Sequence, residues 1–161
     1  MWESWGESFR YVVIRTLTIY RKKDNWYDSG MSQLGVRGVH HVSINVRDAE
    51  EALRFYVEVL GFVERIDRPD FPFAGAWLDV GAGGQQLHLL EVEGVDAPAG
   101  QHFAVGVDDL DAAIAAISAC GVEVSAPTTV GDVARQAILR DPTGNLVDLT
   151  QPLCPAAGPG D

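Results

Sequence analysis

The stretch His40-His41-Val42-Ser43-Ile44-Asn45-Val46 is repeated, later in the chain, as Gln101-His102-Phe103-Ala104-Val105-Gly106-Val107. An offset of 61 positions aligns these two stretches, and the offset becomes 60 further on, where His88 falls on Asp148. The chain is therefore a tandem repeat. Each half carries two side chains that can bind a metal, one near its beginning and one near its end.

The composition limits the class of protein. A chain of 161 residues is long enough for one ordinary domain, or two small domains in close contact, without disulfide bonds. Its two cysteines, Cys120 and Cys154, are not expected to pair, which predicts a reduced, cytoplasmic protein. A formal net charge of -11 repels phosphate backbones and anionic lipids, so we expect a small-molecule substrate and neither nucleic acid nor a membrane as partner.

The ends of the chain differ from its middle. Residues 1–36 hold three of the four tryptophans and form a predicted N-terminal extension of uncertain status. They are either foreign to the native protein, with Met31 as its first residue, or an arm that packs on the domain or on a dimer partner. The predicted domain spans 37–152, with modules at 37–96 and 99–152, and a flexible tail follows at 153–161.

Each half has the pattern of one strand, one helix and three further strands. Asp48 with Glu51 three residues later is typical of a helix start, and Gly61 is typical of its end. Because the same order recurs in the second half, the sequence predicts an α+β fold of two βαβββ modules. The expected strands are 38–46, 62–66, 76–80 and 85–91, then 102–107, 122–125, 134–139 and 145–150, with helices at 48–61 and 109–121.

Strand parity indicates which polar side chains share a face, because neighbours along a strand point to opposite sides. His41 and His102 lie on the polar faces of the two first strands, and His88 and Asp148 occupy equivalent places in the last strands. A buried carboxylate at Asp148 requires a partner. A metal bound by all four residues would supply it. Three imidazoles and one carboxylate suit Zn, Ni, Co, Mn or Fe(II) better than Ca or Mg, in either a closed structural site or an open catalytic one.

Three neighbouring features have simpler interpretations. His40 has the opposite parity and its repeat partner is Gln101, so we interpret it as structural. Glu91 points to the other face from His88 and is expected to be solvated or paired. Gly81–Gly84 lacks the lysine and the following helix of a phosphate-binding loop, which indicates a hairpin turn.

Five segments together resemble the vicinal oxygen chelate superfamily, the group of glyoxalases, bleomycin resistance proteins and extradiol dioxygenases. They lie within 39–151 and are His40–Val46, Phe55–Phe62, Gln86–Leu89, His102–Leu110 and Arg140–Asp148. The resemblance implies a glyoxalase-like fold, in which the two modules form a cupped mixed sheet with the helices outside. It also implies a metal inside the cup that chelates two neighbouring oxygen atoms of the substrate.

Within that superfamily we favour a metal-dependent lyase or isomerase of the glyoxalase type, in which the metal stabilises an enediolate and Asp148 is the catalytic base. The chain departs from lactoylglutathione lyase, which has glutamates where His88 and Asp148 stand. One alternative is an extradiol-type dioxygenase, which the subset of His41, His102 and Asp148 resembles. The other is a non-catalytic protein that binds an antibiotic. We also expect a homodimer.

Side chains that share faces with the four candidate ligands are expected to line a substrate pocket. These are Ser43, Asn45, Gln86 and Thr150. The loop with Phe71 and Phe73, together with Trp77, is expected to wall or cover it, although Trp77 fits the core equally well. Arg68 and Arg140 are candidates for anchoring a substrate carboxylate, or plain surface charges.

Overall fold

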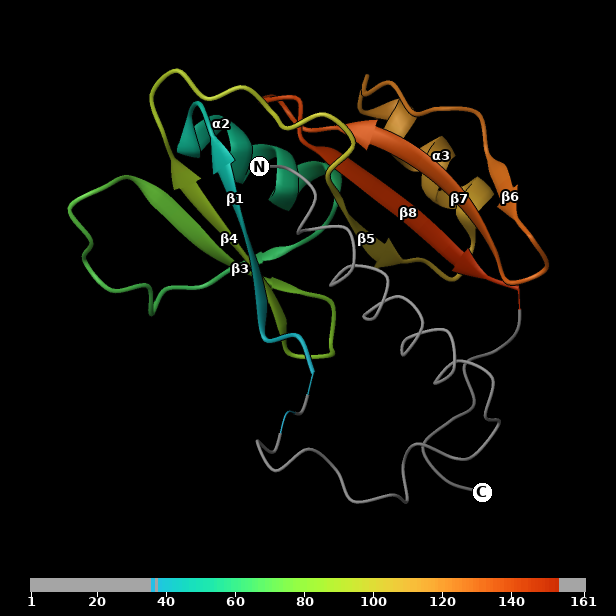
Figure 1. The fold of residues 1–161 in the computed structure, drawn as a ribbon, viewed down its shortest axis with the longest axis horizontal. Coiled ribbons are helices and arrows are strands. Elements are labelled where there is room, and N and C mark those ends of the chain that lie inside the picture. Colours follow the sequence, from blue (N-terminus) through green and yellow to red (C-terminus); the bar gives the residue numbers. More distant parts are fainter. Residues whose placement is uncertain (1–35, 37, 154–161) are drawn as a thin grey trace, which may run out of the picture. The chain divides into compact units, whose positions relative to one another are not determined.

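The computed structural model describes residue 36 and residues 38–153, which Figure 1 shows in colour. The predicted extension and tail lie outside the described residues, apart from positions at their borders. The first module consists of β1 (His41–Val46), α2 (Ala49–Arg54), a π-helical turn η1 (Phe55–Val59), β2 (Val63–Glu64), β3 (Gly75–Val80) and β4 (Gln85–Glu91). The second consists of β5 (His102–Gly106), α3 (Leu110–Ala119), β6 (Thr128–Val130), β7 (Ala134–Arg140) and β8 (Leu146–Pro152).

Each module contains a four-stranded mixed sheet, with the strand orders β1-β4-β3-β2 and β5-β8-β7-β6. In both sheets the first strand is parallel to the last, and the other neighbours are antiparallel. This arrangement confirms the predicted α+β fold of two βαβββ modules. Because the hydrogen bonds divide the strands between two sheets, β1 and β5 are each an edge strand.

The helices begin where the sequence predicts, because an aspartate precedes each of them. Asp48 Oδ1 accepts a hydrogen bond from the backbone N–H of Glu51 at 2.8 Å. Asp109 Oδ1 accepts from the backbone N–H of Ala112 at 3.0 Å. Each aspartate thus satisfies one of the N–H groups that the first helical turn leaves without a partner.

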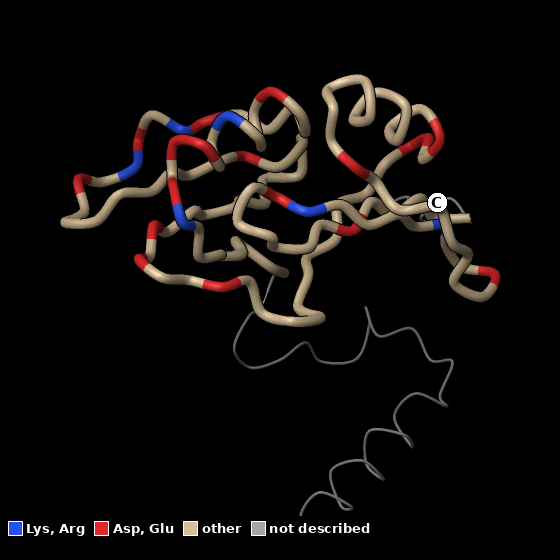
Figure 2. Tube along the Cα trace, turned by 90° about the horizontal axis from the view of Figure 1, so that it is seen from above, with Lys and Arg blue, Asp and Glu red and all other residues tan. Residues whose placement is uncertain are grey.

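The side of each sheet that faces the helices forms the hydrophobic core. Leu78, Leu87 and Leu89 in the first module, and Leu139 and Leu149 in the second, are at most 1% exposed. Figures 1 and 2 show the described helices on one side of the sheets. The alternation of side chains along β4 and β8 therefore leaves the other faces, where the candidate ligands lie, uncovered by these helices.

The π-helical turn η1 explains why the repeat offset changes from 61 to 60. Between the helix start and the glycine that follows it, the first module has one residue more than the second. A π-helical turn accommodates one extra residue, whereas α3 is α-helical throughout. The sequence predicted a single continuous helix over 48–61. The turn also contains Tyr56, a fully buried side chain whose hydroxyl donates to Asp141 of the second module at 3.0 Å.

The strand expected at 122–125 is wrong, because only Val124 pairs there, in an isolated bridge, and the strand β6 begins later. The side chain of Ser125 explains the interruption. Its Oγ accepts from the backbone N–H of Ile138 at 2.9 Å, in place of a backbone carbonyl. Pro127 then has no N–H to donate to a ladder, so regular pairing resumes only after it.

Acidic residues are spread along the described chain, with fewer basic residues between them (Figure 2). This distribution agrees with the formal charge of -11 for the whole chain. None of the described helices is long and apolar enough to cross a membrane.

Candidate functional site

The uncovered face of the first module carries a row of stacked rings. The centroids of His41 on β1 and His88 on β4 are 4.2 Å apart, with planes inclined by 9°. On the other side of His88, the Trp77 ring on β3 lies 4.4 Å away, inclined by 10°. The spacing follows from the sheet, because the three strands are neighbours and the rings stand side by side on one face. Two of the four predicted metal ligands are therefore in contact.

Hydrogen bonds fix the nitrogens of these two imidazoles. His88 Nε2 lies 3.0 Å from Gln86 Oε1, and Gln86 is two residues earlier on the same face of β4. His41 Nδ1 lies 3.0 Å from Nδ1 of His40, whose ring meets the His41 ring edge-on. Gln86, predicted as a pocket residue, thus contacts a candidate ligand, and His40 supports the other.

The second module places Asp148 where the first places His88. Asp148 lies opposite Ala104 in β8, as His88 lies opposite Ser43 in β4, and it is only 5% exposed. Thr150 donates its hydroxyl to Asp148 Oδ1 at 3.0 Å. In the part of the chain that the structure describes, no other side chain bonds to this carboxylate and no Lys or Arg pairs with it. Among the described residues, Asp148 is thus a buried carboxyl group without a basic partner.

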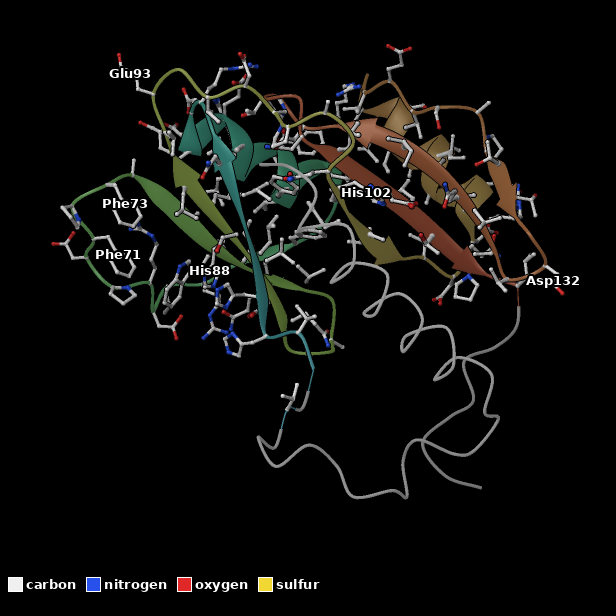
Figure 3. All side chains as sticks on the ribbon, viewed as in Figure 1. Phe71, Phe73, His88, Glu93, His102 and Asp132 are labelled. Carbon is white, nitrogen blue, oxygen red and sulfur yellow. The ribbon has the colours of Figure 1, made fainter. Side chains whose placement is uncertain are left out.

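The predicted ligands form two pairs within one chain. His102 is exposed on β5, diagonally across from Asp148 in the register, and its Nδ1 lies 3.2 Å from the carbonyl oxygen of Gly100. Figure 3 shows His88 and His102 on different modules. Among residue 36 and residues 38–153, no three His, Cys, Asp or Glu side chains are arranged to hold a metal ion. The site of four ligands therefore stays a prediction, with one half-site on each module.

A cavity of about 250 Å³ lies between the edge strands β1 and β5. Ser43, Asn45 and His102 line it together, with Asp96 of the linker between the modules. The structure thus joins two predicted pocket residues of the first module to a predicted ligand of the second. A groove of about 620 Å³ elsewhere contains none of the candidate residues. The predicted pocket residues Phe71, Phe73, Trp77, Gln86 and Thr150 line neither space.

The loop before β3 extends the row of rings. Phe71 and Phe73 stack at 5.1 Å with planes inclined by 13°, and the Phe71 ring lies 6.1 Å from Trp77. Their exposed fractions, 37% and 43%, leave both rings accessible. Arg68 holds this loop, because its guanidinium lies 5.1 Å from the Phe71 centroid and donates to the carbonyl oxygen of Phe73 at 2.9 Å.

The structure adds interactions that the sequence analysis missed. Arg140, predicted as a possible anchor, donates to the carbonyl oxygen of Gly144 at 3.0 Å and so supports its own turn. Arg65, which was not predicted, continues the β2 pairing opposite Trp77 and donates to Asp79 at 2.9 Å. Strand parity could have placed Arg65 and Trp77 on one face, had the strand 62–66 been aligned with 76–80.

Burial lowers the pKa of the His88 imidazole below its ordinary value of 6.5, and repulsion from His41, His40 and Arg65 lowers it further. The neutral form, which has a lone pair to give to a metal, is therefore favoured near neutral pH.

This shift predicts a pH-dependent stability for the metal-free protein. The unfolded chain takes up a proton on His88 near pH 6.5 while the folded chain resists it, so stability is complete above that pH and falls as the pH drops below it. Urea unfolding with a chelator, between about pH 8 and pH 5, measures the free energy of unfolding as a function of pH. This free energy should depend less steeply on pH in His88→Gln than in wild type, by at most about 1.4 kcal/mol per pH unit. The exposed His102 provides the control substitution, His102→Gln. Equal slopes in wild type and His88→Gln would contradict the prediction.

Comparison with known proteins gives matches over most of the chain. Residues 38–149 match the family model described as Glyoxalase/Bleomycin resistance protein/Dioxygenase superfamily. The lactoylglutathione lyase of Haemophilus influenzae is 28% identical over 131 residues, covering 75% of this chain and 97% of the relative. Among solved structures, TnmS3, an antibiotic binding protein from a Streptomyces species, is 30% identical with a TM-score of 0.64, covering 73% of this chain and 98% of that chain. A superfamily member from Sphaerobacter thermophilus is 27% identical with a TM-score of 0.62, covering 72% and 98%.

Proposed function

The chain belongs to the glyoxalase/bleomycin resistance protein/dioxygenase superfamily, and from that premise we propose that it is a metal-dependent lyase or isomerase for a small substrate with two neighbouring oxygen atoms. The observation that carries the proposal is the pair of half-sites on the uncovered sheet faces. On the first, His41 and His88 are in contact. On the second, the buried Asp148 lies diagonally across from His102 in the register. Similarity to a lactoylglutathione lyase supports the reaction class.

The donor chemistry fits a divalent transition metal. In the described part of the chain, the one side-chain partner of the buried Asp148 carboxylate is a neutral hydroxyl, so a nearby cation would relieve the cost of burying its charge. Burial lowers the pKa of the His88 imidazole, which favours its neutral form. With imidazoles at His41 and His102, the set favours Zn, Ni, Co, Mn or Fe(II) over Ca or Mg.

We propose further that two copies of the chain complete the site. Each half-site lies on a sheet face that the described helices leave uncovered, and among the described strands β1 and β5 each form one edge of their sheet. A homodimer in which the first module of one copy faces the second module of the other would unite His41 and His88 with His102 and Asp148. Two such sites would form in each symmetric dimer.

The residues of the chain would then divide the chemistry. When bound, the metal would polarise a carbonyl oxygen of the substrate and make a proton on the neighbouring carbon more acidic. Asp148 would take that proton and return it to the adjacent carbon. Thr150 holds Oδ1 of Asp148, which leaves Oδ2 as the oxygen that exchanges the proton. Ser43 and Asn45, which share the sheet face of His41 and His88, would contact the substrate oxygens.

Metal analysis and a turnover assay test this function together. The wild type should bind metal and convert the hemithioacetal of a 2-oxoaldehyde, whereas the double variant His41→Ala/His102→Ala should lose both properties. Asp132→Ala is the control, because it removes an exposed metal-capable side chain outside the proposed set. Asp148→Asn should lower kcat by about 10²-fold or more, the usual contribution of a general base. If the wild type loaded with each candidate metal turns over no such substrate, the lyase proposal fails. Oxygen consumption with catechols by the Fe(II) form would favour a dioxygenase.

A second candidate function is the binding of a planar aromatic molecule without chemistry. The row of rings from His41 to Phe73 favours it, since Phe71 and Phe73 present accessible aromatic surface at its end. The similarity to an antibiotic binding protein also supports it. An aromatic ligand that binds equally well with and without metal, is recovered unchanged, and loses affinity in Phe71→Ala would establish this function over the lyase.

A further inference from the structure

The uncovered face of the second sheet carries an amide that the fold does not use. Gln136 lies within β7, and its side chain points away from the helices, because its neighbour Ala137 points toward the core and is 1% exposed. The residue is half-buried. Within the described part of the chain, its amide has no hydrogen-bond partner. An amide can both donate and accept, so Gln136 is available to a bound molecule.

A second glutamine, Gln151 on the helix side of the same sheet, shows how a structural amide is used. Its Oε1 accepts from the backbone N–H of Leu110 at 3.3 Å, and its Nε2 donates to the carbonyl oxygen of Asp108 at 3.0 Å. Arg135, which precedes Gln136, lies opposite Gln151 and donates to Asp111 at 2.8 Å. The polar network of this part of the sheet is thus on the helix side, and Gln136 faces the other way.

Gln136 is also close to the proposed catalytic base. It lies opposite Thr150 in the β7–β8 register, and Thr150 donates its hydroxyl to Asp148 Oδ1 at 3.0 Å. Opposite residues have Cβ atoms about 4.5–5.5 Å apart and diagonal neighbours about 7–8 Å, which a glutamine side chain can span. The equivalent pair in the first module is Gly75 with Leu90. This cross-strand pair is therefore polar in the second module and apolar in the first.

We propose that Gln136 binds a further polar group of the substrate, a hydroxyl or an amide beyond the two neighbouring oxygen atoms. This inference rests on the proposed function, because it extends the site around Asp148. The group is uncharged, since a glutamine offers no charge and the Asp148 carboxylate would repel an anion. The simpler role, a contact between two copies of the chain, predicts weaker dimerisation without a change of substrate preference.

Substrates that differ in one polar group test the proposal. The hemithioacetals of one 2-oxoaldehyde with mercaptoethanol, N-acetylcysteamine and ethanethiol carry a hydroxyl, an amide and neither. Wild type should prefer at least one polar substrate over the ethanethiol one by about tenfold in kcat/KM, the size of one hydrogen bond, mainly through a lower KM. Gln136→Met keeps the length of the side chain and should remove this preference. Gln85→Met is the matched control, because Gln85 is an exposed glutamine of β4 in the first module.

The outcomes separate this inference from the proposed function. Equal preferences in wild type and Gln136→Met would overturn the inference while the lyase function stands, and a weaker dimer in sedimentation would then assign Gln136 to the interface. A wild type that turns over none of these substrates would remove the lyase function.

A binding measurement needs neither turnover nor a variant. Lactamide carries two neighbouring oxygen atoms and an amide, so adding it to the wild type should shift the NMR signals of the Gln136 side-chain amide and leave those of Gln85 unchanged. No shift at Gln136 would overturn the inference, whatever the turnover assay shows.

Discussion

Replacing Asp141 by alanine is expected to lower the free energy of unfolding by about 3–5 kcal/mol, because it removes the side-chain acceptor of four hydrogen bonds, three of them buried. Asp141 is 4% exposed. Its Oδ1 accepts from the backbone N–H groups of Gly144 and Asn145, each at 2.8 Å. Its Oδ2 accepts from the side-chain amide of Asn145 at 2.8 Å and from the Tyr56 hydroxyl at 3.0 Å. A buried donor left without a partner costs about 1–3 kcal/mol, and relaxation of the turn reduces the total.

The same network joins the two modules, which makes the effect larger than for an isolated turn. Tyr56 belongs to the first module, and the amide of Asn145 also donates to the backbone carbonyl of Asn45 at 3.0 Å. Burial and the charge of Asp141 raise the pKa of the Tyr56 hydroxyl, so the tyrosine remains a donor at all ordinary pH values. The network therefore anchors the end of β1 to the start of β8, the strand that carries Asp148.

Urea unfolding measures this prediction. Asp109→Ala is the matched control, because Asp109 is exposed and caps a helix with one hydrogen bond, for which a loss of about 1 kcal/mol is expected. A cycle with Tyr56→Phe, Asp141→Asn and the double variant isolates the coupling between modules. If Asp141→Ala costs no more than Asp109→Ala, the network does not join the modules as the structure indicates.

The sequence predicted most of the fold because the repeat doubled every pattern. The alternation of polar and apolar residues around His41 recurs around His102, which supported a strand at both places. An aspartate stands before each of the two helices, at the predicted helix start. The extra residue of the first module was visible only as a change of offset. That it forms a π-helical turn which directs Tyr56 toward Asp141 could not be predicted, because no pattern in the sequence relates these two residues of different modules.

The candidate site could be predicted only in part. Parity along a strand correctly placed His41 beside His88, since both depend on one sheet with a regular register. Parity does not determine how two sheets meet, so the sequence could not show that the half-sites lie apart in one chain. The contact between Trp77 and His88 was missed, although the strands expected at 76–80 and 85–91, joined by a hairpin turn at 81–84, place these two residues opposite each other.

Mixing two inactive variants is expected to restore about a quarter of the wild-type metal sites if the homodimer proposal is correct. One variant, His41→Ala/His88→Ala, lacks the first half-site, and the other, His102→Ala/Asp148→Asn, lacks the second. In a mixed dimer, the intact first module of one chain faces the intact second module of the other, so one of its two sites is complete. Random pairing at equal concentrations makes about half of the dimers mixed.

The recovery distinguishes a shared site from a site within one chain, because in the second case every chain carries a damaged site and mixing restores nothing. The variants are unfolded together and refolded at equal concentrations, and both bound metal and turnover of the hemithioacetal are measured. A mixture of His41→Ala with His88→Ala is the control, since both changes damage the same half-site and no pairing repairs it. Recovery in the first mixture but not in the control would assign the two halves to different chains. No recovery, with a wild type that binds metal as a monomer in sedimentation, would show that the two modules of a single chain must close on each other to unite His88 with Asp148.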